Sequence, residues 1–227
     1  MTRGHFISLE GGEGTGKSTQ SRMLAKRLRE RGIDVVETRE PGGSPAAELV
    51  RKVLLSGAAK PLGPELEAAM FYAARDDHLE TVIRPALADG RWVITDRFAD
   101  STRAYQQAAG TLDRRLLLAM ERVIVDEDWP DLTIILDLDP ELGMTRAGHV
   151  SSWEGVTSDR FEDEDIDFHW KVQDAFLKIA KREPRRCVLV DASPGAEDVG
   201  EVIWQIVSDR LIHNQRSTRQ AKRLKTA

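Results

Sequence analysis

The sequence predicts an α/β fold with a five-stranded parallel sheet flanked by helices. Short apolar runs of strand length alternate along the chain with longer helical patterns, as happens when crossover helices connect parallel strands. Four of the five runs end in an acidic residue, which gathers carboxylates at the sheet edge where such folds bind ligands. The expected strands are residues 5–10, 35–38, 92–96, 132–137 and 187–191.

The helices expected between these strands have recognisable ends. The first covers residues 18–31 and stops before a glycine, which commonly follows the last helical residue. The second begins with Ser44 as its N-cap and Pro45 at its first position. The third extends over residues 64–90 and is bent or interrupted at Pro85, because proline lacks an N–H and crowds the preceding turn. Two more are expected at residues 161–181 and 196–212.

The composition is that of a globular protein with one domain, which we place at residues 1–213. Of the 227 residues, 41% are hydrophobic and 31% are charged, so the chain can bury a core. The formal net charge of −5 argues against a surface that binds nucleic acid non-specifically, but it is compatible with a local basic pocket for phosphates. Cys187 is the single cysteine, so no intramolecular disulfide is possible, and its apolar neighbours predict a buried, unreactive thiol.

Two polar segments are expected to lie outside the packed core. Residues 148–159 contain Gly and Ser and are aperiodic, which predicts a mobile loop. Residues 214–227 carry five basic and no acidic side chains, which predicts a disordered, solubilising tail; contact with nucleic acid or phospholipid is the alternative. No run approaches the ~20 apolar residues that span a membrane. The first apolar stretch is too short for a signal peptide, so we expect a cytoplasmic location.

A phosphate-binding loop is predicted between the first strand and the first helix. Residues 11–18 read Gly-Gly-Glu-Gly-Thr-Gly-Lys-Ser and match the pattern G-x-x-x-x-G-K-[ST]. Its glycines let backbone N–H groups point inward around an anion, and the helix N-terminus adds a positive dipole. We expect Lys17 to reach the β- and γ-phosphates of a purine nucleoside triphosphate, and the Ser18 hydroxyl to contact Mg²⁺. The expected ATP-binding residues are Gly11, Gly12, Glu13, Gly14, Thr15, Gly16, Lys17, Ser18 and Thr19.

Glu13 is unusual in such a loop because its carboxylate would repel the triphosphate that the loop binds. A hydrogen bond from a sugar hydroxyl or a contact with Mg²⁺ would give this carboxylate a role. Exposure to solvent is the alternative.

Three further segments indicate the second substrate. They are Thr-Arg-Glu-Pro-Gly-Gly at 38–43, Phe-Tyr-Ala-Ala-Arg at 71–75, and residues 96–106, which begin Asp-Arg-Phe. Together with the phosphate-binding loop they resemble the thymidylate kinase family over nearly the whole chain, from Phe6 to about Val202. The resemblance implies a P-loop NTPase fold of the nucleoside monophosphate kinase type. It also implies ATP-dependent phosphorylation of dTMP to dTDP, and a homodimer.

An aromatic and a basic side chain on one helix face suit a nucleobase. Phe71 and Arg75 are four residues apart, so a ring can stack on a base while a guanidinium donates to a base oxygen. The resemblance implies that they do this to thymine, that Gln106 meets the ring N3, and that Tyr105 crowds C2′ against a ribose. Core packing or a surface charge are the alternatives for these residues. The expected dTMP-binding residues are Glu13, Glu40, Pro41, Phe71, Arg75, Arg97, Ser101, Tyr105 and Gln106.

Asp96 and Arg97 follow each other at the end of the third strand, and the resemblance places them between the two nucleotides. Arg97 would neutralise phosphate oxygens during transfer, and Asp96 would orient the arginine or a water on Mg²⁺; a surface ion pair is the alternative. The resemblance also predicts a tight turn with a cis Glu40–Pro41 peptide facing the acceptor. Because a phosphomonoester has a second pKa of about 6, we expect no dedicated general base.

A lid is expected at about residues 145–160. Some thymidylate kinases carry an arginine in the phosphate-binding loop where this sequence has Gly14, so the chain resembles the bacterial type, which supplies arginines from the lid. We expect Arg160 or Arg146 to stabilise the transferred phosphoryl group. Two other functions stay open at this point. One is a different small-nucleotide or deoxynucleoside kinase; the other is a nucleotide-dependent switch that binds a macromolecule through the tail.

Overall fold

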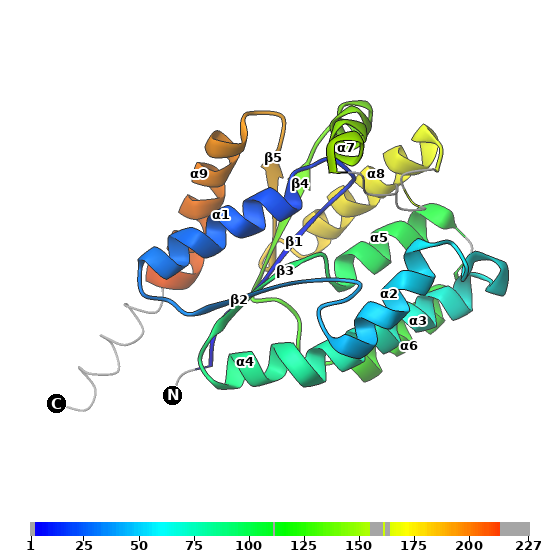
Figure 1. The fold of residues 1–227 in the computed structure, drawn as a ribbon, viewed down its shortest axis with the longest axis horizontal. Helices are drawn as coiled ribbons and strands as arrows, with labels where there is room; N and C mark the ends of the chain where they lie inside the picture. Colours follow the sequence, from blue (N-terminus) through cyan, green and yellow to red (C-terminus); the bar gives the residue numbers. More distant parts are fainter. Residues whose placement is uncertain (1–2, 111, 155–160, 162–163, 214–227) are drawn as a thin grey trace.

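One parallel sheet carries helices on both of its faces (Figure 1). The computed structural model describes residues 3–110, 112–154, 161 and 164–213, except for the side chains of 149–154. Within these ranges the sheet has five strands in the order β2-β3-β1-β4-β5, and each neighbouring pair is parallel. The strands are β1 (Phe6–Gly11), β2 (Val35–Arg39), β3 (Trp92–Asp96), β4 (Leu132–Asp137) and β5 (Cys187–Asp191).

The helices fill the connections between the strands. The α-helices are α1 (Lys17–Glu30), α2 (Pro45–Leu55), α3 (Pro64–His78), α4 (Arg84–Ala88), α5 (Ala99–Ala109), α6 (Arg114–Met120), α7 (Pro140–Glu154), α8 (Ile166–Arg182) and α9 (Ala196–Val207). A short 3₁₀ turn, η1 (Lys60–Leu62), precedes α3, and three π-helical turns are η2 (Leu79–Ile83), η3 (Glu121–Val125) and η4 (Ser208–His213).

Different helices cover the two faces of the sheet. Helices α1 and α9 pack on one face, where Leu28 and Ile203 meet strand residues such as Leu9. On the other face, α3, α4, α5 and α8 cover residues such as Phe6 and Ile135 (Figure 1). All six residues of β1 are buried, as expected for the central strand of a parallel sheet with two covered faces. The phosphate-binding loop therefore leaves the most rigid part of the molecule.

The five predicted strands are confirmed, with boundaries that differ by no more than one residue. The predicted break near Pro85 is also confirmed. The helix that begins as α3 widens into the π-helical turn η2 before it resumes as α4, and Pro85 lies in the first turn of α4. Proline lacks the N–H that would donate within the helix, and the π-helical turn immediately before it is where the α-helical geometry is lost. Ser44 lies at the N-cap of α2 as predicted, but its hydroxyl donates to Asp77 instead of accepting from a backbone N–H of α2.

Two expectations about the helical segments were wrong, and two helices were not predicted. The loop expected at 148–159 is helical as far as Glu154, where α7 ends, and residues 155–159 lie outside the described residues. An established helix gains one hydrogen bond with each added residue, and no proline stops it there. Helix α8 begins at Ile166 and not at 161, since Asp165 caps it by accepting from the N–H of Phe168. Helices α5 and α6 were not predicted, although α5 carries much of the site described below.

Several further expectations concern single residues and segments. Cys187 is a buried thiol, as predicted, and burial raises its pKa to about 12. In the described part of the chain no helix is long and apolar enough to cross a membrane. The basic tail at 214–227 and the lid residues 155–160, with Arg160, lie outside the described residues.

Candidate active site

The phosphate-binding loop joins β1 to α1 at the carboxyl edge of the sheet. Gly11, Gly14 and Gly16 have φ angles of +137°, +65° and +88°, which side chains with a Cβ rarely adopt. A Cβ built on Gly14 would lie 1.9 Å from the carbonyl oxygen of Gly143, so the loop and α7 touch through their backbones. Lys17 lies across the loop, and its Nζ donates to the Gly12 carbonyl at 2.6 Å. The phosphate-binding loop predicted from the sequence is therefore formed, and its lysine side chain folds back onto the loop backbone.

Glu13 faces cations and not solvent. Its Oε1 accepts from Nη2 of Arg97 at 2.6 Å and from the Tyr105 hydroxyl at 2.5 Å. Burial alone raises the pKa of Glu13, but the charges of Arg97 and Lys17 and the Tyr105 hydrogen bond outweigh burial and lower the pKa to about 2. The carboxylate that the sequence left unexplained thus neutralises the arginine that follows β3.

Ser18 and Asp96 meet where α1 begins and β3 ends. The Ser18 hydroxyl donates to Oδ2 of Asp96 in a very short hydrogen bond. Hydroxyl and carboxylate oxygens are the hard donors that Mg²⁺ prefers, and protein sites usually hold it by one or two carboxylates plus substrate phosphates. Within the described residues no group of three His, Cys, Asp or Glu side chains gathers to hold a metal by itself. The oxygen atoms of Ser18 and Asp96, beside the phosphate-binding loop, therefore suit a magnesium ion that is bound together with a nucleotide.

Arg97 lies in the tight turn that follows β3, and its side chain bonds to the phosphate-binding loop and to α5. It is one of two residues other than glycine with positive φ in the described chain, at +71°. Its Nη1 donates to the Gly11 carbonyl at 3.1 Å and to the Ser101 hydroxyl at 3.2 Å. Opposing carboxylates raise the pKa of Arg97 well above its ordinary value despite burial, so it stays charged. The structure therefore brings Arg97, Ser101 and the phosphate-binding loop together.

Glu10 lies under this turn and was not singled out by the sequence. It is fully buried at the end of β1, where its Oε1 accepts from the N–H of Phe98 at 2.8 Å. Its Oε2 meets the Ser101 hydroxyl at 2.5 Å. Burial and the negative charge of Asp100 raise the pKa of Glu10 to about 8. The only sequence signal for it was an acidic residue that ends an apolar strand.

Arg75 projects from α3 into a buried network. Its Nε donates to Glu40 at 2.8 Å and its Nη2 donates to Thr102 at 3.0 Å. His78 holds the other oxygen of Glu40 through Nδ1 at 3.0 Å. The peptide between Glu40 and Pro41 is cis, which confirms that prediction. Glu40 therefore fixes the Arg75 side chain, and the alternative of a surface charge is wrong.

Two buried polar atoms near Thr102 have no hydrogen-bond partner within the described residues. They are Nη1 of Arg75 and Oε1 of Gln106. Thr102 and Gln106 are one turn apart on α5, so the Arg75–Thr102 contact brings Arg75 and Gln106 to the same place. The exposed fractions of Arg75 and Gln106 are 2% and 5%. A buried donor and a buried acceptor without partners are costly in a folded protein, and a ligand edge with the complementary acceptor and donor would satisfy both.

Aromatic side chains line the same end of the molecule. Phe71 lies one turn before Arg75 on α3, and its ring centre is 6.3 Å from that of Phe161. Tyr105 is 5.2 Å from Phe161 and packs edge-on against it. Arg97 lies 5.0 Å from the centre of the Tyr105 ring, and the Tyr105 hydroxyl donates to Glu13, so this ring links α5 to the phosphate-binding loop.

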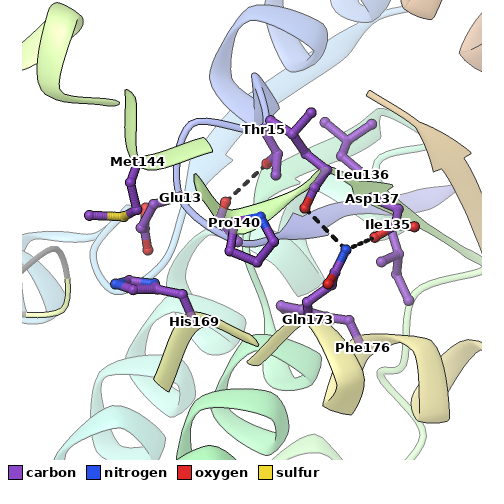
Figure 2. A pocket seen from close by; sticks show the side chains of 12 residues that line it. Glu13, Thr15, Ile135, Leu136, Asp137, Pro140, Met144, His169, Gln173 and Phe176 are labelled. Atoms are coloured by element: carbon purple, nitrogen blue, oxygen red, sulfur yellow. Dashed lines mark hydrogen bonds between the residues drawn. The ribbon is translucent and has the colours of Figure 1, made fainter. Parts of the chain in front are cut away.

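A recess lies beside the phosphate-binding loop, between the end of β4 and helices α7 and α8 (Figure 2). Glu13, Met144 and His169 point into its open end, and Gln173 closes the other end by donating to Asp137 at 2.8 Å (Figure 2). Nε2 of His169 is buried without a partner among the described residues. Sequence reasoning missed His169 and Gln173, because a His or Gln inside an amphipathic helix carries no local signal.

Arg146 is bound to the loop that follows β5. Its two Nη atoms donate to the carbonyls of Ala192 at 2.8 Å and of Ser193 at 2.9 Å, in the loop that joins β5 to α9. Arg146 therefore joins α7 to the loop after β5. This contact gives no support to Arg146 as the transfer arginine.

Helix α5 is anchored from behind by a buried charge network that the sequence did not reveal. Asp100 has no exposed surface and accepts from both Nη atoms of Arg186, at 2.6 and 3.1 Å. Arg103 donates to Glu121 at 2.6 and 2.7 Å, and both arginines stack on Trp129. This network fixes the helix that carries Ser101, Tyr105 and Gln106.

Comparisons with known proteins agree on one family. A family model described as "Thymidylate kinase" matches residues 9–203. The chain is 55% identical over 210 residues to the thymidylate kinase of Bradyrhizobium sp. (strain ORS 278), covering 92% of each chain. It is 51% identical over 216 residues to that of Rhodopseudomonas palustris (strain TIE-1), covering 95% of this chain and 93% of the other. The crystal structure of thymidylate kinase from Ehrlichia chaffeensis matches with a TM-score of 0.71 and 33% identity, over 90% of this chain and 99% of that chain.

Proposed function

The chain belongs to the thymidylate kinase family and phosphorylates dTMP to dTDP with ATP; we propose how its residues divide that work. The match spans the phosphate-binding loop and every segment that suggested a second nucleotide. It therefore decides against the two alternatives that the sequence left open, a different nucleotide kinase and a non-catalytic switch.

The single observation that carries our assignment of the acceptor site is the pair of unpartnered atoms on Arg75 and Gln106. One is a donor and the other an acceptor, and Arg75 bonds to Thr102, which lies one turn before Gln106 on α5. The thymine edge offers the complement, an O4 acceptor next to an N3–H donor, whereas cytosine presents a donor at C4 and an unprotonated N3. Phe71, one turn before Arg75, supplies a ring on which the base stacks.

The phosphate of dTMP competes with Glu13 for Arg97. In the structure the Arg97 guanidinium is held by Glu13, Gly11 and Ser101, all at the edge of the phosphate-binding loop. A phosphate binds a guanidinium through charge-assisted hydrogen bonds and can replace the carboxylate partner. Glu13 then keeps the Tyr105 hydroxyl and is positioned to accept from a sugar hydroxyl. Glu40 and Pro41 border the acceptor through the cis turn and the Glu40–Arg75 contact.

The donor side uses the residues that the sequence motif named. Backbone N–H groups of the loop and Nζ of Lys17 hold the ATP phosphates, and Lys17 exchanges its contact with Gly12 for them. Ser18 and, through water, Asp96 are the residues that would hold Mg²⁺, and they already lie in contact with each other. When bound, Mg²⁺ neutralises charge on the ATP phosphates. The acceptor phosphate is already ionised near neutral pH, so no protein group has to remove a proton from it.

We propose residues 1–213 as one domain with a lid at about 145–160. Gly14 and Gly143 bring the phosphate-binding loop and the first turn of α7 into backbone contact, so a movement of α7 is transmitted to the bound phosphates. Arg160, which lies outside the described residues, stays our first choice for the arginine that meets the transferred phosphoryl group, because Arg146 is held by the loop after β5. Closure would exclude water, which otherwise hydrolyses ATP.

We propose a homodimer that pairs through α2, α3 and α6. These helices lie next to one another (Figure 1) and expose large apolar side chains. Leu49 on α2, Leu66 on α3 and Leu118 on α6 are 65%, 47% and 42% exposed. Large apolar side chains that are exposed on neighbouring helices are typical of protein–protein interfaces. The test is light scattering after gel filtration, with V202E as the matched control because Val202 is 49% exposed on α9, away from these helices. The wild type and V202E should have twice the monomer mass, and L66E should have the monomer mass. A dimeric L66E would contradict this interface.

A substrate panel tests the acceptor assignment. ADP release is followed with dTMP, dUMP, dCMP, AMP, GMP and thymidine as acceptors at one ATP concentration. We expect turnover of dTMP and, less efficiently, of dUMP, because both share the O4 and N3–H edge, and none above background for dCMP. Turnover of dCMP equal to that of dTMP would refute the edge assignment.

We also propose a cytoplasmic location, since ATP and dTMP are metabolites of that compartment.

A further inference from the structure

Glu10 is the one fully buried carboxylate at the nucleotide edge to which the mechanism above gives no task, among the residues that the structure describes. It is the second-to-last residue of the central strand β1. Its backbone pairs with Ile135 of β4, so the sheet fixes where its side chain begins. Burying a carboxyl group is costly unless its oxygens are hydrogen-bonded, and both oxygens of Glu10 are.

Both bonds go to the turn that carries Arg97. The chain leaves β3 with Arg97 at φ +71°, a conformation in which a side chain with a Cβ is strained. The N–H of Arg97 donates to the Leu9 carbonyl at 2.9 Å, and the next N–H, that of Phe98, donates to Oε1 of Glu10 at 2.8 Å. Two successive residues of β1 therefore hold two successive residues of the turn.

The second oxygen of Glu10 reaches the Arg97 side chain through one intermediate. Oε2 of Glu10 and Oγ of Ser101 are 2.5 Å apart, and the same Oγ accepts from Nη1 of Arg97 at 3.2 Å. A serine hydroxyl has one hydrogen and two lone pairs, so donating that hydrogen to Glu10 sets the direction of the lone pair that accepts from Arg97. The side chain of Glu10 thus connects to Arg97 at both its backbone and its guanidinium.

We infer that Glu10 is a positioning residue for phosphoryl transfer, which sets the place of Arg97 through the Phe98 N–H and the Ser101 hydroxyl. This inference rests on the proposed role of Arg97 at the acceptor phosphate. A misplacement of about 1 Å can reduce a rate on the order of 10²-fold, so a residue that holds the arginine matters for turnover without touching substrate. The length of glutamate is part of the requirement, because the anchors at 98 and 101 are three residues apart while Cα of residue 10 is fixed by the sheet.

The protonation of Glu10 indicates which substitution preserves the arrangement. Because the pKa of Glu10 is about 8, the carboxyl group carries a proton most of the time at pH 7. The ionised carboxylate accepts from the Phe98 N–H with one oxygen and from the Ser101 hydroxyl with the other; once protonated, it keeps both contacts but donates to Ser101. Glutamine does the same with its carbonyl oxygen and its NH₂ group, whereas aspartate is one methylene too short to reach both.

The experiment compares E10Q, E10D and E10A in steady-state turnover of dTMP with ATP at pH 7. We expect E10Q to keep kcat within about 3-fold of the wild type, and E10D and E10A to lose about 10- to 100-fold in kcat. The KM for ATP should stay within about 3-fold in all of them, because the donor loop is not held by Glu10. The matched control is S8A, two residues earlier on the same face of β1. Ser8 is equally buried and bonds to Thr133 at 2.8 Å, away from Arg97, so S8A should retain wild-type kcat.

A double-mutant cycle separates positioning from general structural damage. R97A should lower kcat, and E10A added to R97A should lower it by no more than about 3-fold further, because Glu10 acts through Arg97. Full multiplication of the two losses, or a wild-type kcat in E10D, would overturn the inference while leaving the role of Arg97 intact. A wild-type kcat in R97A would overturn the role of Arg97 and this inference with it. Should E10A fail to fold, the contrast between E10Q and E10D still decides.

Discussion

Replacing Gln106 by leucine should make the protein more stable and a poorer enzyme at once. The Gln106 side chain is 5% exposed and its Oε1 is buried without a partner among the described residues. Leucine has a similar volume and no polar atom, so Q106L removes an unsatisfied acceptor without leaving a large cavity. The same change removes the group that we assign to N3–H of thymine.

The magnitudes follow from the cost of an unpaired polar group. A buried acceptor without a partner costs about 1–3 kcal/mol, so the free energy of unfolding should rise by about 1 kcal/mol or more in Q106L. In a domain of this size that is a rise in Tm of about 2–4 °C per kcal/mol. In the complex, the leucine leaves N3–H of the base unpaired at the same cost, so kcat/KM for dTMP should fall roughly 5- to 150-fold.

Urea unfolding and steady-state kinetics measure the two effects on one preparation. The KM for ATP should not change, because Gln106 lies on α5 and not in the phosphate-binding loop. The matched control is Q107L, at the neighbouring exposed position of the same helix, which should leave kcat/KM unchanged. A less stable Q106L with an unchanged kcat/KM for dTMP would show that Gln106 is a core residue and that the base does not bind where we place it.

Three further predictions concern stability. Because Glu13 has a folded-state pKa of about 2 against an ordinary 4.5, its contribution of about 3 kcal/mol is fully present above pH 4.5 and is lost as the pH falls towards 2. Urea midpoints of wild type and E13Q should therefore converge between pH 5 and 2, and a constant gap would contradict the pairing. R186M leaves the buried Asp100 without its main partner, so the free energy of unfolding, measured by urea titration, should fall by about 3–5 kcal/mol. A fall of less than about 1 kcal/mol would mean that Arg103 alone is enough to neutralise Asp100. G14A should lower both the urea midpoint of unfolding and kcat, because Gly14 has a φ of +65° and the new Cβ would meet the α7 backbone. In the control G12A the new Cβ would enter open space. Equal effects of the two substitutions would refute the close contact between the loop and α7.

Features encoded by a few adjacent residues could be predicted from the sequence. Residues 11–18 specify the phosphate-binding loop because glycines, a lysine and a helix start within eight positions leave few other conformations. Phe71 and Arg75 share a helix face because four residues make about one turn. The strands were located to within a residue, because a parallel sheet covered by helices on both faces requires runs of apolar, β-branched side chains, and such runs are visible in the sequence.

Features that join distant segments were decided by the tertiary structure. The partner of Glu13 is Arg97, 84 residues away, and that of Asp100 is Arg186, 86 residues away. Glu10 meets Ser101 across 91 residues. Nothing beside these residues in the chain indicates such pairings, because they depend on the order β2-β3-β1-β4-β5, which sets β1 between β3 and β4. By itself the sequence determined which chemical groups the site contains; the packing of strands and helices decided which of them touch, and therefore which carboxylate holds which arginine.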